Sequence, residues 1–481
     1  MRAVLTVFEG VAAGAADGYA RMTGTPAATL LHLGPGLAYG LANLHNARRA
    51  KVPVLSIVGD HATYHARYDP PLQSDIETIA RNVSTWVRTS RSAEDLGRDA
   101  VEAIAAAVGP PGQVATLIVP ADVSWQEGGA VAAPMPPAAP PSAPAEVVEA
   151  VAGAIRSSSR TGLLLGGRAL RGEALLAAAR IAAATGAQLF AERSTPCLER
   201  GAGLPAVQRL AYWPELAAKQ LDGLEHLILV DAAAPVAWFA YPGARSELAP
   251  DGCQLHELAP YTADVLGSLS ALVEALDASD ARPSLQPASV PPPPSGPLTA
   301  EKACQAIGAI LPEGAILSDE AITSAAALPA STAGAPRHDW LALTGGAIGQ
   351  GLPVAVGAAI ACPDRPVISL EADGSAQYTI QSLWTMAREQ LDVTVVIFNN
   401  RGYAILGAEL GRLPEPSAGE RARALLGLGD PDLDFVKLGT GFGVASRRVE
   451  TGEQLTGALN DALRDPGPHL IEAVLPPVSK S

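Results

Sequence analysis

The stretch from Val367 to Gly402 constrains the fold of this chain more than any other part of the sequence. It begins with a short apolar, β-branched run and a Gly turn. An amphipathic segment follows at Tyr378–Glu389, and a second apolar run lies at Val393–Phe398. Two strands joined by a helix in this order predict a βαβ unit with parallel strands and a right-handed crossover.

Polar residues follow both strands of this unit. Asp373 comes directly after the first strand, and Asn400 follows the second strand, 27 positions further on. The carboxyl ends of neighbouring parallel strands meet at one sheet edge, where open α/β sheets bind their ligands. The Asp373 carboxylate, the Asn400 side-chain carbonyl and a backbone carbonyl at Gly402 form an oxygen set that suits Mg²⁺ and leaves room for phosphates. The stretch therefore predicts a Mg²⁺ site that holds a diphosphate.

This pattern resembles the signature of the thiamine diphosphate enzymes, in which Gly-Asp-Gly is followed after about this distance by Asn-Asn. The resemblance implies thiamine diphosphate and Mg²⁺ as cofactors, and Asp373, Asn400 and Gly402 as the metal site. Gly374 and Ser375 join Asp373 and Asn400 as candidate cofactor-binding residues. The chain departs from the signature at Ala372, where the family usually has a glycine. An extra methyl group fits there if the backbone φ is negative.

The composition is that of a soluble globular α/β enzyme. The 481 residues suffice for about three domains, and the chain is 48% hydrophobic and 17% charged. A formal charge of −15 without a basic cluster argues against nucleic acid as a partner. The four cysteines stand singly, as in reduced proteins, and no apolar run is long enough for a membrane span. We expect a cytoplasmic protein without membrane contact.

The first predicted domain spans residues 1–131. Its strands are expected at Val4–Phe8, Ala27–His32, Val52–Val58 and Ala115–Val119. Helices are expected at Gly10–Met22, from the Gly34-Pro35-Gly36 turn to about Arg49, and at Ala93–Val108. This alternation predicts a mostly parallel sheet.

Glu9 lies between the first predicted strand and the first predicted helix. A carboxylate there can simply complement the helix dipole. The surrounding residues, Phe8-Glu9-Gly10 through Asp17-Gly18-Tyr19-Ala20-Arg21, resemble the pyrimidine-binding half of the thiamine diphosphate enzymes. In that family the matching Glu lies against N1′ of the aminopyrimidine, so the resemblance implies a catalytic and cofactor-binding role for Glu9.

The start of the chain departs from the family pattern. Members usually begin well before this Glu, with a helix and a strand that end in a Gly-rich loop near the substrate, and the sequence has no such segment. Either Met1 is an internal methionine of a longer reading frame, which we favour, or the first domain lacks its opening strand and helix. The second case would leave an open sheet edge and an incomplete substrate pocket.

Four polar residues of the first domain are candidates for the substrate pocket. His61 and His65 follow the strand predicted at Val52–Val58, where pocket loops belong. Histidines at such a place can transfer protons to substrate intermediates, although a loop histidine is often only a solvated polar group. His32 precedes the Gly-Pro-Gly turn, and Lys51 is expected near the same edge. We take His61 and His65 as candidate catalytic residues.

Two proline-rich stretches divide the rest of the chain. Residues 132–144 and 282–297 are predicted to be extended linkers, which leaves a central domain at 145–281 and a third domain at 298–481. In the central domain Gly166-Gly167-Arg168 follows a predicted strand, but the full Gly-x-Gly-x-x-Gly fingerprint is absent. The resemblance implies a Rossmann-like domain that binds FAD in some members and nothing in others. We favour a structural role over FAD binding.

The third domain holds two further candidate sites. Thr323 follows a predicted strand end, where backbone amides and hydroxyls can hold phosphate oxygens. The small residues from Thr344 to Pro353 can reflect close packing alone. The resemblance matches Ile348 to the apolar residue that bends the cofactor into a V, and Gly346 to the carbonyl that accepts from its 4′-amino group.

The resemblance covers the whole chain. It implies an α/β fold with three domains, in which two thiamine diphosphate-binding parallel-sheet domains flank a Rossmann-like domain. It is closest to the acetolactate synthase large subunits and the benzoylformate decarboxylases, which act on 2-oxo acids. We expect acetolactate synthase-like carboligation, with simple decarboxylation of a 2-oxo acid as the alternative. A hypothesis of another class is a paralogue that binds the cofactor without turnover and acts as a regulatory partner.

The two halves of the predicted cofactor site lie at opposite ends of the sequence. Family members place the cofactor between the first domain of one subunit and the third domain of another. The resemblance therefore implies a homodimer or a tetramer with shared active sites.

Overall fold

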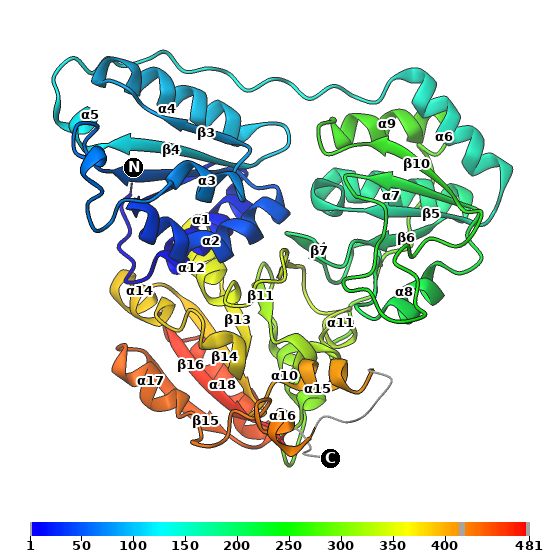
Figure 1. Cartoon of the computed structure of the whole chain (residues 1–481). Coiled ribbons are helices and arrows are strands. Elements are labelled where there is room, and N and C mark those ends of the chain that lie inside the picture. Colours follow the sequence, from blue (N-terminus) through cyan, green and yellow to red (C-terminus); the bar gives the residue numbers. More distant parts are fainter. Residues whose placement is uncertain (1, 413–418, 478–481) are drawn as a thin grey trace. The chain divides into compact units, whose positions relative to one another are not determined.

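The chain folds into three separate parallel sheets covered by helices (Figure 1). A computed structural model describes residues 2–412 and 419–477. The first and third sheets belong to one compact unit, and the central sheet belongs to a second unit built mainly from Pro137–Ala288. The predicted α/β fold with three domains is thereby confirmed, while the boundaries placed at the linkers stay predictions.

The first domain is built on a parallel sheet in the order β1-β2-β4-β3. Its elements are α1 (Glu9–Thr23), β1 (Ala27–His32), α2 (Leu33–Ala50), β2 (Val54–Asp60), η1 (Ala66–Tyr68), α3 (Ile76–Arg81), β3 (Trp86–Thr89), α4 (Ala93–Val108), β4 (Val114–Pro120) and α5 (Ala121–Trp125). Val54, Val58 and Ile118 pack under α1, α2 and α3 on one face, and Leu55 and Leu117 pack under α4 on the other. The inner strands are apolar almost throughout because both faces are covered.

Two predictions for this domain are wrong. Val4–Phe8 forms no strand, and β1 is instead an edge of the sheet, with Leu30 78% exposed. Strand propensity is largely a matter of packing against neighbours, so an apolar β-branched run does not fold as a strand by itself. Gly34, Pro35 and Gly36 lie inside the first turn of α2 rather than between elements. Proline is tolerated there because the first helical N–H groups have no partner within the helix.

The central domain has a parallel sheet in the order β10-β9-β5-β6-β8. Its elements are α6 (Ala145–Ser157), β5 (Thr161–Leu165), η2 (Gly167–Leu170), α7 (Gly172–Thr185), β6 (Gln188–Ala191), β7 (Leu198–Arg200), β8 (Gln208–Arg209), α8 (Pro214–Leu221), β9 (His226–Val230), β10 (Gln254–Ala259) and α9 (Val265–Ala275). Leu163 and Ile228 pack under α6, α7 and α9, and Leu164 and Leu227 pack under α8. Helices on both faces of a parallel sheet make the domain Rossmann-like.

The third domain contains parallel strands in the order β15-β16-β14-β13-β11-β12. Its elements are α10 (Ala300–Ile310), β11 (Ile316–Glu320), η3 (Ile322–Ala325), α11 (Leu328–Ser331), β12 (His338–Ala342), α12 (Gly351–Ala361), β13 (Val367–Ala372), α13 (Asp373–Ala376), α14 (Ser382–Glu389), β14 (Val393–Asn399), α15 (Ala404–Leu410), α16 (Glu420–Ala424), α17 (Phe435–Gly441), β15 (Ala445–Val449), α18 (Gly452–Ala462) and β16 (His469–Val474).

The predicted βαβ unit is confirmed, because β13 and β14 pair in parallel with Ala372 opposite Phe398. The crossover helix is shorter than the amphipathic run at Tyr378–Glu389 predicts. It is divided into α13 and α14, and the turn between them places the Thr379 hydroxyl where it donates to the Gly349 carbonyl at 3.0 Å. The chain between α13 and α14 is therefore not helical, and Thr379 there is hydrogen-bonded to the loop that precedes α12.

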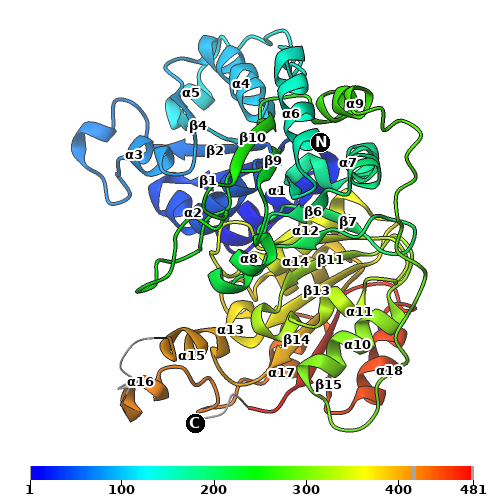
Figure 2. The same ribbon diagram turned by 90° about the vertical axis from the view of Figure 1, so that its right-hand side faces the viewer.

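Helices α1 and α12 lie side by side within the first compact unit (Figures 1 and 2). Small residues make the approach close, since a Cβ on Gly18 would overlap Val354 and one on Gly357 would overlap the backbone of α1. The first and third domains of one chain are therefore in direct contact, although the sequence separates them by the whole central domain. None of the helices in the described part of the chain has the length and apolar content that a membrane crossing requires.

Candidate active site

Asp373 and Asn400 lie at the same sheet edge, as the sequence predicts. Asp373 directly follows β13, and Asn400 directly follows the neighbouring strand β14. The backbone of Ala372 has φ −77°, so the methyl group that replaces the family glycine causes no strain. The edge is also that of β11, whose Glu320 lies opposite Glu371 of β13. Thr323, in η3 just after β11, is exposed at this edge.

The Asp373 carboxylate is buried but only partly hydrogen-bonded. Its Oδ1 accepts from the Gly374 amide at 2.8 Å, while Oδ2 is buried and has no hydrogen-bond partner among the described residues. Burial raises the pKa of Asp373 to about 6, against the opposing effect of the backbone N–H groups of Gly374, Arg401 and Gly402. A buried carboxylate oxygen without a partner is costly unless a cation joins it, so the site fits a Mg²⁺ ion.

The turn after β14 arranges the other candidate ligands. The Asn400 side-chain oxygen accepts from the Gly402 amide at 3.1 Å, and Arg401 between them has a positive φ of 58°. The turn also directs the backbone amides of Arg401 and Gly402 toward the Asp373 carboxylate, whose pKa they lower. Asn399 differs from Asn400, because its amide donates to Glu472 at 2.8 Å inside the sheet. Asn399 is therefore buried in the sheet, whereas Asn400 is half-buried in the turn beyond the strand end.

Gly374 and Ser375 shape the turn in front of the carboxylate. A Cβ on Gly374 would overlap the Tyr403 ring, so the position requires glycine. The Ser375 hydroxyl donates to the backbone carbonyls of Glu320 and Ala372, both at 3.1 Å. No group of three or more His, Cys, Asp or Glu side chains in the described ranges is arranged to hold a metal. A metal at this edge would therefore depend on Asp373, neutral oxygens and ligand phosphates.

Behind this edge lies a buried carboxyl pair that sequence reasoning missed, Glu320 and Glu371. Glu320 accepts from the amides of Gly349 at 2.9 Å and Gly351 at 2.8 Å, at the start of α12. Burial raises the pKa of Glu320 to about 7. Burial and the neighbouring Glu320 charge raise the pKa of Glu371 well above its usual value. Because the amides favour an ionised Glu320, Glu371 is the neutral acid of the pair. The sequence signal that could have revealed this pair is an acidic residue within each of two otherwise apolar strands.

Replacing Glu371 with glutamine is expected to stabilise the fold at neutral pH. The Glu371 pKa is higher in the folded chain than in the unfolded chain, so the folded state retains a proton that the unfolded state loses. Stability then falls by up to ~1.4 kcal/mol per pH unit above about pH 4.5. A glutamine at position 371 can still donate a hydrogen bond, but it does not titrate, so it removes this pH dependence of stability. Thermal unfolding of the cofactor-free protein at pH 5 and pH 8 measures the difference. An exposed control, Glu301→Gln, should show no such gain, and an equal gain in both variants would contradict the assignment.

The Gly-rich loop Thr344–Gln350 joins β12 to α12. Its Gly346 is exposed with φ +78°, Ile348 is half-buried, and Gly349 has φ +92°. Gln350 closes the loop, since its side-chain oxygen accepts from the Thr344 amide at 3.1 Å and its nitrogen donates to Asp17 of α1 at 2.6 Å. The loop therefore has a fixed base and an exposed tip that contains the Gly346 carbonyl and the Ile348 side chain.

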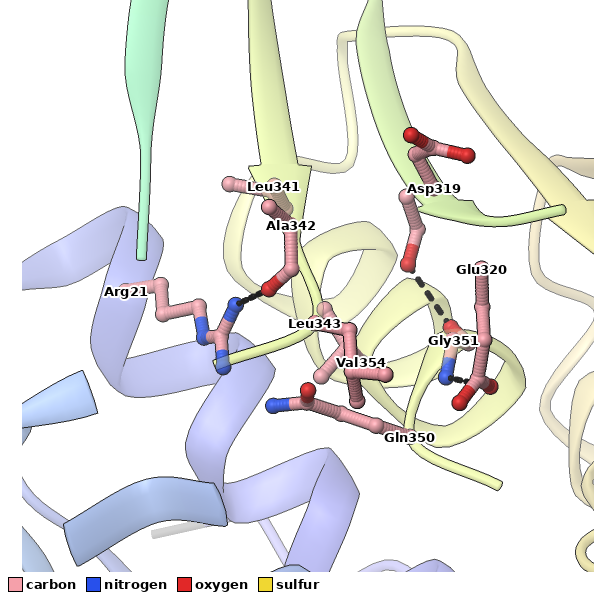
Figure 3. A pocket seen from close by; sticks show the side chains of 10 residues that line it. Arg21, Asp319, Glu320, Leu341, Ala342, Leu343, Gln350, Gly351 and Val354 are labelled. Carbon is pink, nitrogen blue, oxygen red and sulfur yellow. Dashed lines mark hydrogen bonds between the residues drawn. The ribbon is translucent and has the colours of Figure 1, made fainter. Parts of the chain in front are cut away.

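A small pocket lies beside the base of this loop (Figure 3). Arg21 donates to the Ala342 carbonyl at 2.8 Å on one side, and the Glu320 carboxylate accepts from Gly351 on the other. The empty volume is ≈ 150 Å³, whereas small-molecule sites span roughly 300–1,000 Å³. The pocket is thus an interior gap at the contact of α1 with the third domain and not a substrate site.

Glu9 is the first residue of α1 and is half-buried. A Cβ on Gly36 would lie 3.5 Å from both a carboxylate oxygen of Glu9 and the Cβ of His32, so these two side chains flank Gly36. His32 ends β1 opposite Gly59 of β2. The Glu9 carboxylate and His32 therefore lie at the same edge of the first sheet, where its parallel strands end. The family resemblance predicts the pyrimidine-binding site at this edge.

The loop after β2 brings His61 and His65 together. Their ring centroids are 5.7 Å apart, and His61 Nε2 is buried with no partner among the described residues. Thr63 anchors the loop by donating its amide to Asp122 at 2.9 Å and its hydroxyl to the same carboxylate at 2.5 Å. Lys51, also predicted near this edge, does not lie with these histidines. It precedes β2, and its carbonyl faces Gly112 just before β4, so it lies at the opposite edge of the sheet.

The glycine pair of the central domain serves the protein's own side chains. A Cβ on Gly166 would overlap Asp231 and approach Glu192 at 2.7 Å, and Gly167 also faces Asp231. Arg168 pairs with Asp231 at 2.7 Å and donates to the Tyr261 carbonyl at 2.7 Å. Two carboxylates thus occupy the strand-end position where a dinucleotide-binding sheet would hold a diphosphate.

Comparisons with protein-family models and with known proteins point to one family. Residues 1–81 match the N-terminal TPP binding domain of the thiamine pyrophosphate enzymes, and residues 324–473 match the C-terminal TPP binding domain. A Mycobacterium tuberculosis protein provisionally named as the acetolactate synthase large subunit IlvX is 55% identical over 99% of this chain and 92% of its own length. The chain belongs to the thiamine pyrophosphate enzyme family. Its Glu9 lies within the matched N-terminal region, and Asp373 and Asn400 lie within the matched C-terminal region.

Other relatives of this thiamine pyrophosphate enzyme are named as decarboxylases. Benzoylformate decarboxylase of Pseudomonas aeruginosa is 31% identical over 98% of this chain and 91% of its own length. The structure of a Rhodococcus jostii thiamine diphosphate-dependent 4-hydroxybenzoylformate decarboxylase aligns with a TM-score of 0.85 and 25% identity, covering 99% of this chain and 92% of that one. The chain is a thiamine pyrophosphate-dependent enzyme of the acetolactate synthase and benzoylformate decarboxylase group.

Proposed function

We propose that this enzyme decarboxylates a 2-oxo acid and joins the product to a second carbonyl compound, as an acetolactate synthase does. The observation that carries this proposal is the 55% identity, over nearly the whole chain, to a protein provisionally named as an acetolactate synthase large subunit. Bound thiamine diphosphate supplies the electron sink that allows a 2-oxo acid to lose CO₂. The chain's own residues bind, orient and hold protons around it.

The metal edge of the third domain would hold the diphosphate. Asp373, Asn400 and Gly402 would bind Mg²⁺, and the orphaned, buried Oδ2 of Asp373 supports this assignment. Gly374 and Ser375 would give the diphosphate access to the turn after β13, and Thr323 would offer an exposed hydroxyl at the neighbouring strand end. These residues bind and orient, and none of them moves a proton.

The proton-handling residues come from the first domain. Glu9 would hold a proton at the pyrimidine N1′. From the third domain, the Gly346 carbonyl would accept from the 4′-amino group and Ile348 would support the cofactor. His61 and His65, with His32 at the adjacent strand end, would move protons on the substrate side. We propose a structural role for the central domain, since Asp231 and Glu192 take the place of a bound diphosphate and leave FAD unsupported.

A panel of 2-oxo acids tests the proposal. The protein with thiamine diphosphate and Mg²⁺ is expected to release CO₂ and to form acetolactate from pyruvate. Aldehyde without a carboligation product would favour the second candidate, a benzoylformate decarboxylase-type activity, which the likeness to two such decarboxylases supports. Bound cofactor with no CO₂ from any acid would favour the third hypothesis, a paralogue that binds without turnover.

A further inference from the structure

We propose that three side chains of α2, Asn43, His45 and Asn46, clamp the Gly-rich loop of the third domain and so position the Gly346 carbonyl and Ile348 for the cofactor. They are positioning residues, since they hold the loop backbone rather than reacting atoms. The inference rests on the proposed function for what the loop does, but the clamp itself is a property of the chain without cofactor.

The clamp holds alternate residues of the loop. The Asn46 amide donates to the Ala347 carbonyl at 2.8 Å, and its oxygen accepts from the Ala347 amide at 3.3 Å. His45 Nε2 lies 3.0 Å from the Gly345 carbonyl. Asn43 donates to the Gly349 carbonyl at 3.1 Å. Residues 345, 347 and 349 are thus held by α2, and the two residues between them are those assigned to the cofactor.

Both asparagines are buried and fully engaged. Asn46 is 0% exposed and also donates to the Asn43 side-chain oxygen at 3.1 Å. Asn43 is 3% exposed, and its nitrogen donates to the Gly10 carbonyl at 2.8 Å as well as to the loop. The same amide therefore ties the loop to the residue that follows Glu9. Buried polar networks that are satisfied in this way fix one arrangement of the groups that they join.

The fit beneath the clamp is tight. A Cβ on Gly345 would overlap the Asn46 oxygen and lie 2.7 Å from the His45 ring, so only glycine allows this approach. On the far side of the loop, Gln350 bonds to Asp17, which pairs with Arg21 of the same helix at 2.7 Å (Figure 3 shows Arg21 and Gln350). The loop is therefore held from two sides, and only its tip remains open.

A clamp is needed because the loop is intrinsically loose. Gly345, Gly346 and Gly349 have more backbone freedom than any other residue type, and ordering them costs the most entropy. If the protein orders the loop in advance, cofactor binding does not have to supply that free energy. The carbonyl of Gly346 can then meet its partner only in the direction that the clamp sets.

Hydrogen exchange without cofactor is the direct test of the clamp. Asn46→Ala removes both bonds to Ala347, and exchange across residues 345–350 is expected to become at least about tenfold faster, as loss of one buried hydrogen bond predicts. The matched control is Asn460→Ala in α18, whose amide bonds only within its own helix, to Thr456 at 2.9 Å. It should leave the loop unchanged. His45→Ala gives a second, half-buried position in case Asn46→Ala does not fold, and His45→Gln should restore part of the protection by keeping a donor.

Cofactor binding and turnover show what the clamp does. Thiamine diphosphate, titrated by intrinsic fluorescence in the presence of Mg²⁺, is expected to bind about tenfold more weakly to the Asn46→Ala protein. In steady-state assays kcat should fall while the KM for the 2-oxo acid stays unchanged. Unchanged exchange in both the Asn46 and His45 variants would overturn the clamp. Faster exchange with unchanged cofactor affinity would overturn its positioning role. If the wild type binds no cofactor, the proposed function fails, while the exchange result still decides the clamp.

Discussion

Two inactive variants of this chain are expected to restore activity to each other. Glu9→Ala removes the pyrimidine acid, and Asp373→Ala removes the metal ligand, so neither protein alone should release CO₂. If the site combines Glu9 of one subunit with Asp373 of another, random pairing of equal amounts makes half of the dimers mixed, and one site in each is intact. About one quarter of the wild-type activity should return.

Co-expression with two different affinity tags provides the mixed dimers and their control. Dimers purified through both tags should be active, and each variant purified alone should be inactive. The structure makes this experiment informative, because α1 and α12 of one chain are already in contact within one compact unit. Doubly tagged dimers without activity would show that each chain completes its own site, and the shared-site proposal would then fail.

The local sequence pattern determined most of the fold. Strand β1 begins and ends at the predicted residues, and so does α4. The βαβ unit around Asp373 was predictable because strand, turn and helix are each encoded within a few residues. Val4–Phe8 was not, because a strand also needs a partner to pair with, and that information is not local.

The candidate site divides in the same way. Asp373 and Asn400 could be paired from the sequence because one crossover separates them. The clamp could not be predicted, since Asn46 and Ala347 lie about 300 positions apart and nothing in either segment refers to the other. Glu320 and Glu371 are a similar case. They are neighbours because the register of β11 and β13 pairs Glu320 with Glu371. Strand register depends on the whole sheet and cannot be read from one segment.

Asp373→Asn is expected to abolish cofactor binding and at the same time to stabilise the cofactor-free chain. Loss of the charged ligand should weaken Mg²⁺-dependent binding of thiamine diphosphate by at least about a hundredfold, because hard cations depend on carboxylate oxygens. In the empty chain the Asp373 pKa is raised from 3.8 to about 6 by burial. The folded state therefore holds the proton more tightly than the unfolded state, and stability falls as the pH rises from about 4 to about 6.

The pH dependence separates this prediction from a general effect of the substitution. At pH 7 the wild type carries the full penalty, of the order of 3 kcal/mol, and asparagine removes it, whereas at pH 4 the two proteins should differ little. Thermal unfolding at both pH values, with and without thiamine diphosphate and Mg²⁺, measures both effects. The matched control is Asp364→Asn, an exposed carboxyl just before β13, which should change neither stability nor binding. Cofactor affinity retained in Asp373→Asn would contradict the metal assignment, since the only carboxylate among the three proposed ligands would then be dispensable.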